Sequence, residues 1–96
     1  RFDATAFLRR GMIRYELADL DGALIDFNQA ILLNNENSYA FFSRAIVYAE
    51  QNKLDSALAD LNSVLTIDPN NSLTYFRRAL IYSDQKKIDK ALDDYN

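Results

Sequence analysis

Apolar and small residues recur three or four positions apart along most of the chain, a spacing that places them on one face of an α-helix. In the first such stretch the pattern includes Phe7, Gly11, Ile13 and Leu17. Short polar segments such as residues 34–37 interrupt the pattern and predict turns. The sequence therefore predicts an all-α protein with helices over residues 4–17, 22–33, 38–51, 55–67, 73–85 and from 89 to 96.

The chain also repeats itself with a period of 34 residues and no gap. The units are residues 4–37, 38–71 and, incomplete, 72–96, which together form one domain over residues 1–96. Such a period is typical of a solenoid, in which each unit packs only on its neighbours. The columns that are identical in all three units are Arg10/Arg44/Arg78, Asp21/Asp55/Asp89, Ala23/Ala57/Ala91, Leu24/Leu58/Leu92, Asp26/Asp60/Asp94 and Asn28/Asn62/Asn96.

Each unit resembles the tetratricopeptide repeat, a family with two antiparallel helices per 34 residues. Its signature of an aromatic, a small residue, a second aromatic and a central alanine is matched in the second unit by Phe41, Ala45, Tyr48 and Ala57. The first unit departs from it most clearly at Arg14, where an aromatic is usual. The resemblance covers 93 of the 96 residues and implies a right-handed superhelical solenoid of about 2.75 repeats.

Composition excludes most catalytic chemistry from these residues. The chain has no His and no Cys, so the commonest zinc sites, thiol nucleophiles and Ser-His-Asp triads cannot form. Its two glycines, Gly11 and Gly22, are too few and too far apart for a phosphate-binding loop. We therefore expect no enzymatic activity, metal or cofactor here. Because the chain begins with Arg1 rather than Met, we expect a longer parent protein, in which an enzyme domain could lie outside these residues.

Charge and hydropathy narrow the class of partner. The net charge is −3 and no basic stripe is present, which argues against nucleic acid. No apolar run approaches the roughly 18 residues that span a membrane. The expected partner is therefore a protein or peptide, and the expected function is that of a non-catalytic interaction or scaffold module.

The resemblance implies that the first helices of successive units line a concave groove. Three apolar pairs, each one helical turn apart, would form a stripe along it. Burial between units is an equal alternative for Leu8, Phe42 and Phe76. The residues that the resemblance places in the groove are Thr5, Leu8, Arg9, Met12, Tyr15, Glu16, Tyr39, Phe42, Ser43, Ile46, Ala49, Glu50, Leu73, Phe76, Arg77, Leu80, Ser83 and Asp84.

Some family members clamp the terminal carboxylate of a chaperone tail with Lys, Asn and Arg side chains. At the corresponding places this chain has Leu8, Leu73, Met12 and Ser43, and only Arg77 matches. A carboxylate would lack its donors, so we do not expect a chaperone tail. We expect an extended or helical peptide held mainly by apolar contacts.

Two invariant columns of opposite charge predict ion pairs within each unit: Arg10 with Asp26, Arg44 with Asp60 and Arg78 with Asp94. A third column predicts helix N-caps at Asp21, Asp55 and Asp89. By resemblance, Gly11 faces Ala23.

One alternative to partner binding is a purely structural or self-associating segment. Near the C-terminal end, Leu92 and Tyr95 have no further unit to cover them. A solenoid end needs a polar cap, so we expect either further repeats in a longer parent protein or a homo-oligomer that forms through that end.

Overall fold

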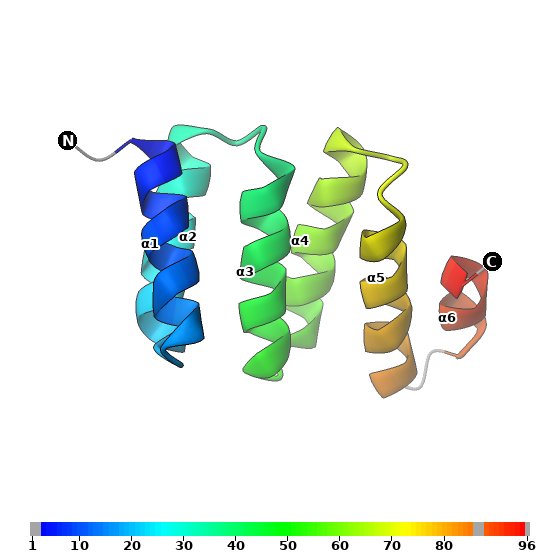
Figure 1. Ribbon diagram of the computed structural model, residues 1–96. Coiled ribbons are helices and arrows are strands. Elements are labelled where there is room, and N and C mark those ends of the chain that lie inside the picture. The colour runs from blue at the N-terminus through cyan, green and yellow to red at the C-terminus, as the bar shows by residue number, and fades with distance from the viewer. Residues whose placement is uncertain (1–2, 86–87, 96) are drawn as a thin grey trace.

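The computed structural model describes residues 3–85 and 88–95, apart from the side chains of residues 88, 89 and 91. The described residues form only helices, and each helix lies within two residues of its predicted bounds (Figure 1). The all-α prediction is therefore confirmed. The helices are α1 (Ala4–Glu16), α2 (Leu20–Leu33), α3 (Ser38–Glu50), α4 (Leu54–Ile67), α5 (Ser72–Asp84) and α6 (Ile88–Tyr95).

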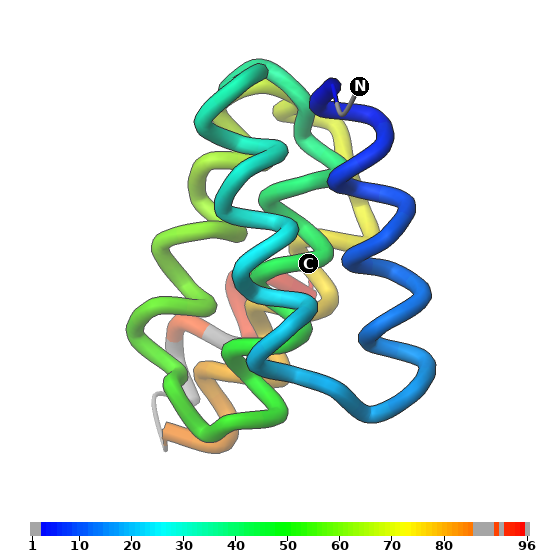
Figure 2. Tube along the Cα trace, turned by 90° about the vertical axis from the view of Figure 1, so that its left-hand side faces the viewer, coloured from blue at the N-terminus to red at the C-terminus, as the bar shows by residue number. Residues whose placement is uncertain are grey.

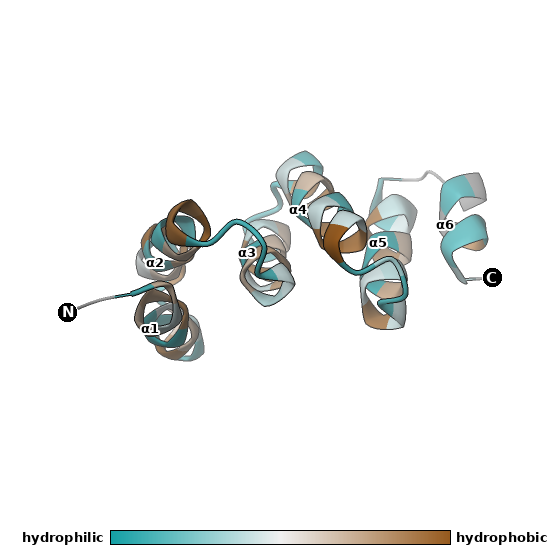
Figure 3. Cartoon of the chain, turned by 90° about the horizontal axis from the view of Figure 1, so that it is seen from above, coloured by the Kyte–Doolittle hydropathy of each residue, from teal (hydrophilic) through white to brown (hydrophobic). Residues whose placement is uncertain are grey.

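The helices pair within each unit as α1 with α2, α3 with α4 and α5 with α6, and the pairs stack into an elongated solenoid of 46 × 26 × 17 Å. Seen from above, α1, α3 and α5 form one layer while α2 and α4 form a second (Figure 3). Figure 2 looks at the stack from the end where α1 and α2 lie, with the later units behind them.

A close approach of α1 and α2 sets the geometry of the first unit. Phe27 and Ala23 are fully buried between the helices. A Cβ added to Gly11 would lie 2.6 Å from the Phe27 ring and 3.2 Å from Cβ of Asp26. A larger residue at position 11 would therefore meet Phe27 and Asp26 of α2, the helix that also carries Ala23.

The predicted ion pairs are present in all three units. In each pair the guanidinium binds both carboxylate oxygens, with N to O distances between 2.7 and 2.8 Å. The carboxylate of Asp26 is fully buried and Asp60 is 4% exposed. Charge-assisted, bidentate bonds of this kind are among the stronger hydrogen bonds in proteins, and here each one joins the two helices of a unit.

Arg44 and Arg78 also bind the preceding unit. Nη1 of Arg44 donates to Oδ1 of Asn28 at 2.9 Å, and Nη1 of Arg78 donates to Asn62 at the same distance. The Arg44 guanidinium also lies 5.8 Å from the Phe41 ring centroid and 5.6 Å from that of Tyr48, within the range of cation–π attraction. We call each such arginine, with its partners, an arginine node.

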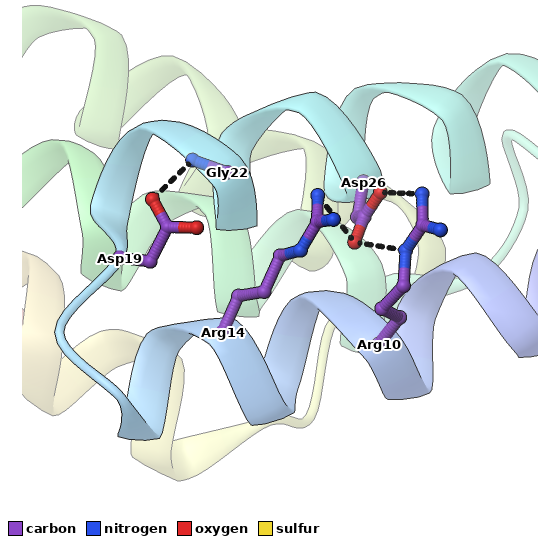
Figure 4. Close-up of polar contacts among 5 residues, drawn as sticks. All are labelled: Arg10, Arg14, Asp19, Gly22 and Asp26. Carbon is purple, nitrogen blue, oxygen red and sulfur yellow. Dashed lines mark hydrogen bonds and ion pairs between the residues drawn. The ribbon is translucent and has the colours of Figure 1, made fainter.

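The first unit replaces one ring of the node with a second cation. Arg14 stands where Tyr48 stands in the second unit, and its Nη1 lies 3.4 Å from Oδ2 of Asp26 (Figure 4). Asp26 therefore faces two guanidiniums, Arg10 and Arg14. This second ion pair accounts for a departure from the family signature that the sequence alone did not explain.

The N-cap prediction for Asp21 and Asp55 is wrong. Helix α2 begins at Leu20, so its cap is Asp19, whose Oδ1 accepts the Gly22 N–H at 3.0 Å (Figure 4). Helix α4 begins after Lys53, which makes no side-chain cap bond. The predicted helix starts were late, and this displaced the caps.

The invariant aspartates instead join neighbouring units. Asp21 accepts an amide N–H from Gln51 at 3.3 Å, and Asp55 accepts one from Gln85 at 3.0 Å. Both also lie in the first turn of a helix, where a negative charge is favourable. The side chain of Asp89 lies outside the described residues.

Replacing Arg44 with Met should lower the free energy of unfolding by about 3 kcal/mol or more, because it leaves the buried Asp60 carboxylate without its cation. The matched control is Arg9→Met, an exposed position, which should change it by less than about 0.5 kcal/mol. Urea denaturation of both variants measures the difference. Equal effects of the two substitutions would show that the node adds no stability.

Candidate peptide-binding groove

Three hollows lie between the helices of the layer formed by α1, α3 and α5. The first lies between α1 and α3 and has a volume of about 210 Å³. The second, about 340 Å³, lies between α3 and α5 near Tyr39 and Leu73. The third, about 500 Å³, lies between α3 and α5 near Ala49 and Leu80. Ile46 lines all three hollows and so marks the centre of the groove.

Most residues expected in the groove line at least one of these hollows. They include three aromatic side chains, and the tyrosines among them each carry a hydroxyl group. The groove residues from the sequence that the structure brings together are Met12, Tyr15, Glu16, Tyr39, Phe42, Ser43, Ile46, Ala49, Glu50, Leu73, Arg77, Leu80 and Asp84.

Leu8, Phe42 and Phe76 occupy equivalent positions but have different surroundings. Leu8 is 9% exposed and belongs to the core between the first two units, so its proposed place on the groove surface is wrong. Phe42 is half-buried, packs on the second core and still lines the second hollow. Phe76 packs edge to face on Tyr95 of α6, with ring centroids 5.8 Å apart, and lines a separate hollow there. Arg9 is exposed outside the three hollows.

The sequence did not reveal the floor of the third hollow. Ala45, Leu61 and Ile81 line it, although all three are buried and belong to the core of the second unit. Their periodicity marks them as core residues, and the small side chain of Ala49 lines the hollow beside them. The sequence does hold one indication of this hollow. At equivalent positions the first unit has the large Tyr15 and the second has the small Ala49.

A hydrogen bond crosses the groove from the first unit to the second. The hydroxyl of Tyr15 on α1 donates to Oε1 of Glu50 on α3 at 2.5 Å. This bond and partial burial raise the pKa of Tyr15 above its ordinary value of about 10, while the nearby charge of Arg77 acts in the opposite direction. Tyr15 therefore remains a neutral donor at physiological pH.

Charged residues form two rows along the helices that carry the groove, although Arg9 lies outside the three hollows. The last residues of α1, α3 and α5 are Glu16, Glu50 and Asp84, so three carboxylates lie at helix C-termini, where the helix dipole disfavours negative charge. Two turns earlier, Arg9 and Arg77 supply positive charge on α1 and α5. An apolar row lies between them, formed by Met12, Ile46 and Leu80.

The groove side chains offer a ligand hydrogen bonds, charged groups and apolar contact. Among residues 3–85 and 88–95, no group of three or more metal-binding side chains comes together. None of the described helices combines the length and the apolarity that crossing a membrane requires.

Comparison with known proteins agrees with the repeat and the paired helices. A model described as tetratricopeptide repeat matches residues 4–37, and a second, described as TPR repeat, matches residues 45–86. The chain belongs to the tetratricopeptide repeat family. A comparison with curated protein sequences gives no match.

Solved structures share the fold of this tetratricopeptide domain. The crystal structure of MamA superposes with a TM-score of 0.95 at 22% identity, over 97% of this chain and 54% of MamA. The Arabidopsis OM64 TPR domain gives 0.91 at 23%, over 96% and 76% of the two chains. The first TPR of Spaghetti (RPAP3), bound to the HSP90 peptide SRMEEVD, gives 0.92 at 20%, over 97% and 74%. The domain spans about half the length of MamA.

Replacing Glu50 with Ala should lower the pKa of Tyr15 toward about 10, because the hydrogen bond that raises it is lost. In the wild-type protein, the hydrogen bond from Tyr15 to Glu50 should contribute its full stability below pH about 10. This contribution should disappear as the pH rises through the raised pKa of Tyr15 in the folded state. NMR titration of a ¹³C-labelled Tyr15 ring measures this, with Glu16→Ala as the control. An unchanged Tyr15 titration in Glu50→Ala would contradict the assigned cause.

Proposed function

We propose that this tetratricopeptide domain is a non-catalytic protein-interaction module that binds a segment of a partner protein in its groove. The observation that supports this most strongly is the convergence of three hollows on Ile46. Large apolar side chains in such hollows are the contacts that dominate peptide interfaces. Leu73 and Leu80 are already exposed beside them, so a ligand would cover apolar surface that water now contacts.

The proposed ligand is an extended or helical amphipathic segment. Its apolar face would lie on Met12, Ile46 and Leu80. Positive and negative edges flank this row, so a ligand of mixed or slightly basic charge fits better than a strongly acidic one. Because the central contacts are apolar, affinity should depend only weakly on salt.

The groove does not favour a chaperone tail. The RPAP3 structure shows that a similarly folded domain binds an HSP90 peptide. In this chain Leu8 is buried, and Met12, Ser43 and Leu73 line the places where the family's clamp has Lys and Asn donors. Only Arg77 remains to bind a terminal carboxylate, so the two grooves would select different ligands.

Ile46→Ala tests the central position. We would select peptides from a random library against the wild-type protein and measure their affinities by fluorescence anisotropy. Ile46→Ala should weaken the binding of a selected peptide by about 1–3 kcal/mol, because Ile46 lines all three hollows of the groove.

The matched control is Ile25→Ala on α2, where the isoleucine is exposed and away from the hollows. It should leave the affinity unchanged, and thermal unfolding should show that both variants are folded. If peptides bind Ile46→Ala as tightly as the wild type, or lose affinity only in Ile25→Ala, the groove is not the binding surface.

Self-association stays a second candidate, because one apolar column is uncovered in the third unit. Leu92 on α6 is 56% exposed, whereas its equivalent in the second unit, Leu58, is 9% exposed and packs near Ile81. We propose that α6 offers this face to a second copy of the chain. Light scattering over a range of concentrations tests it, and a monomer at high concentration would exclude it.

A further inference from the structure

The first two units show how this fold fills the space beside a groove carboxylate. Tyr15 lines both the first and the third hollow, and its hydroxyl donates to Glu50 at the end of α3. The phenol thus combines apolar contact with one hydrogen bond to a carboxylate. Because the units are related by a shift of 34 residues, this arrangement has an equivalent place between the second and third units.

At that equivalent place the carboxylate is present but the phenol is missing. The shift carries Glu50 onto Asp84, which ends α5 as Glu50 ends α3. It carries Tyr15 onto Ala49, whose methyl group cannot reach Asp84. The third hollow lies here, lined by both Ala49 and Asp84, and at about 500 Å³ it is larger than the first hollow at about 210 Å³.

Asp84 is free to accept a hydrogen bond. Its side chain is exposed, and no hydrogen bond or ion pair joins it to any other described residue. The remaining walls suit an aromatic ring, since Ile46 and Leu80 line the sides and Leu61 lines the floor. The hollow therefore offers apolar contact around a carboxylate that has no partner among the described residues.

The walls of the third hollow suit a phenol better than a charged side chain. Arg77 lines the hollow and offsets part of the attraction that Glu50 and Asp84 exert on a lysine or arginine side chain, and the apolar walls would take that cation out of water at a cost. Glu50 and Asp84 line the hollow too and would repel a carboxylate or a phosphate. A phenol hydroxyl carries no charge at neutral pH and donates one hydrogen bond, so it meets neither that cost nor that repulsion.

We propose that the third hollow is a binding site for a tyrosine side chain of the ligand. The ring would lie against Ile46, Ala49 and Leu80, and the hydroxyl would donate to Asp84 as Tyr15 does to Glu50. This inference rests on the proposed function, since the tyrosine belongs to the segment that the groove binds. It adds a residue preference that the fold alone does not imply.

The probes are N-acetyltyrosinamide and N-acetylphenylalaninamide, which differ only in the hydroxyl. We would titrate each into ¹⁵N-labelled protein and follow the amide signals. Both should shift the signals of Ala49, Leu80 and Asp84, and the tyrosine amide should bind about tenfold more tightly, as expected for a hydrogen bond to a charged acceptor.

Two variants separate the hydroxyl from the ring. Asp84→Ala should remove the difference between the two amides while leaving weak binding of both. Ala49→Tyr should abolish binding of both, because the introduced phenol occupies the third hollow. Glu36→Ala, which removes a carboxylate from an exposed turn, should change neither affinity. Thermal unfolding should confirm that each variant is folded.

Equal affinities of the two amides for the wild type would overturn the proposal. So would shifts located outside the third hollow, the absence of saturable shifts, or unchanged binding in Ala49→Tyr. If selected peptides bind through Ile46 but the amides fail, the groove function stands and the tyrosine site is wrong. If the amides bind but no peptide depends on Ile46, the proposed function is wrong.

Discussion

The structure depends on one arginine that is repeated in every unit. In the second unit, Arg44 holds the buried carboxylate of Asp60 with two bonds and reaches back to Asn28 in the first unit. A single side chain therefore fixes the angle within one helix pair and the position of that pair on its neighbour. Because the Asp60 carboxylate is buried, loss of Arg44 would leave a buried charge without a partner. The free-energy cost of that charge favours this arrangement of the helices over others.

The groove follows from this stacking. Once the nodes place α1, α3 and α5 in one layer, the side chains that face the same way form rows along the solenoid. The hollows then arise where the side chain at equivalent positions differs in size between units. The change from Tyr15 in the first unit to Ala49 in the second opens the largest of the three hollows. An identical backbone repeat can thus carry a binding surface that differs from unit to unit.

The sequence predicted the features that every unit shares. A 34-residue period in apolar spacing and invariant charge is enough to predict the helix pairs and the Arg–Asp bonds, because each copy confirms the others. The prediction failed where a shift of two residues in a helix boundary matters, since the cap of α2 is Asp19 and not Asp21. It also failed at Leu8, since a neighbouring unit decides whether an inward side chain is core or surface. The sequence also did not predict the hollows, because each one depends on how side chains from neighbouring helices pack together.

The most direct test of this account is the exchange of arginine side-chain protons, measured by ¹⁵N NMR of the Nε–H groups. Arg10, Arg44 and Arg78 donate Nε–H to a carboxylate, so their signals should be dispersed and exchange slowly with water. Arg9 and Arg77 are exposed, so their signals should cluster together and exchange fast. If the node arginines exchange as fast as Arg9 and Arg77, the nodes do not hold the units together.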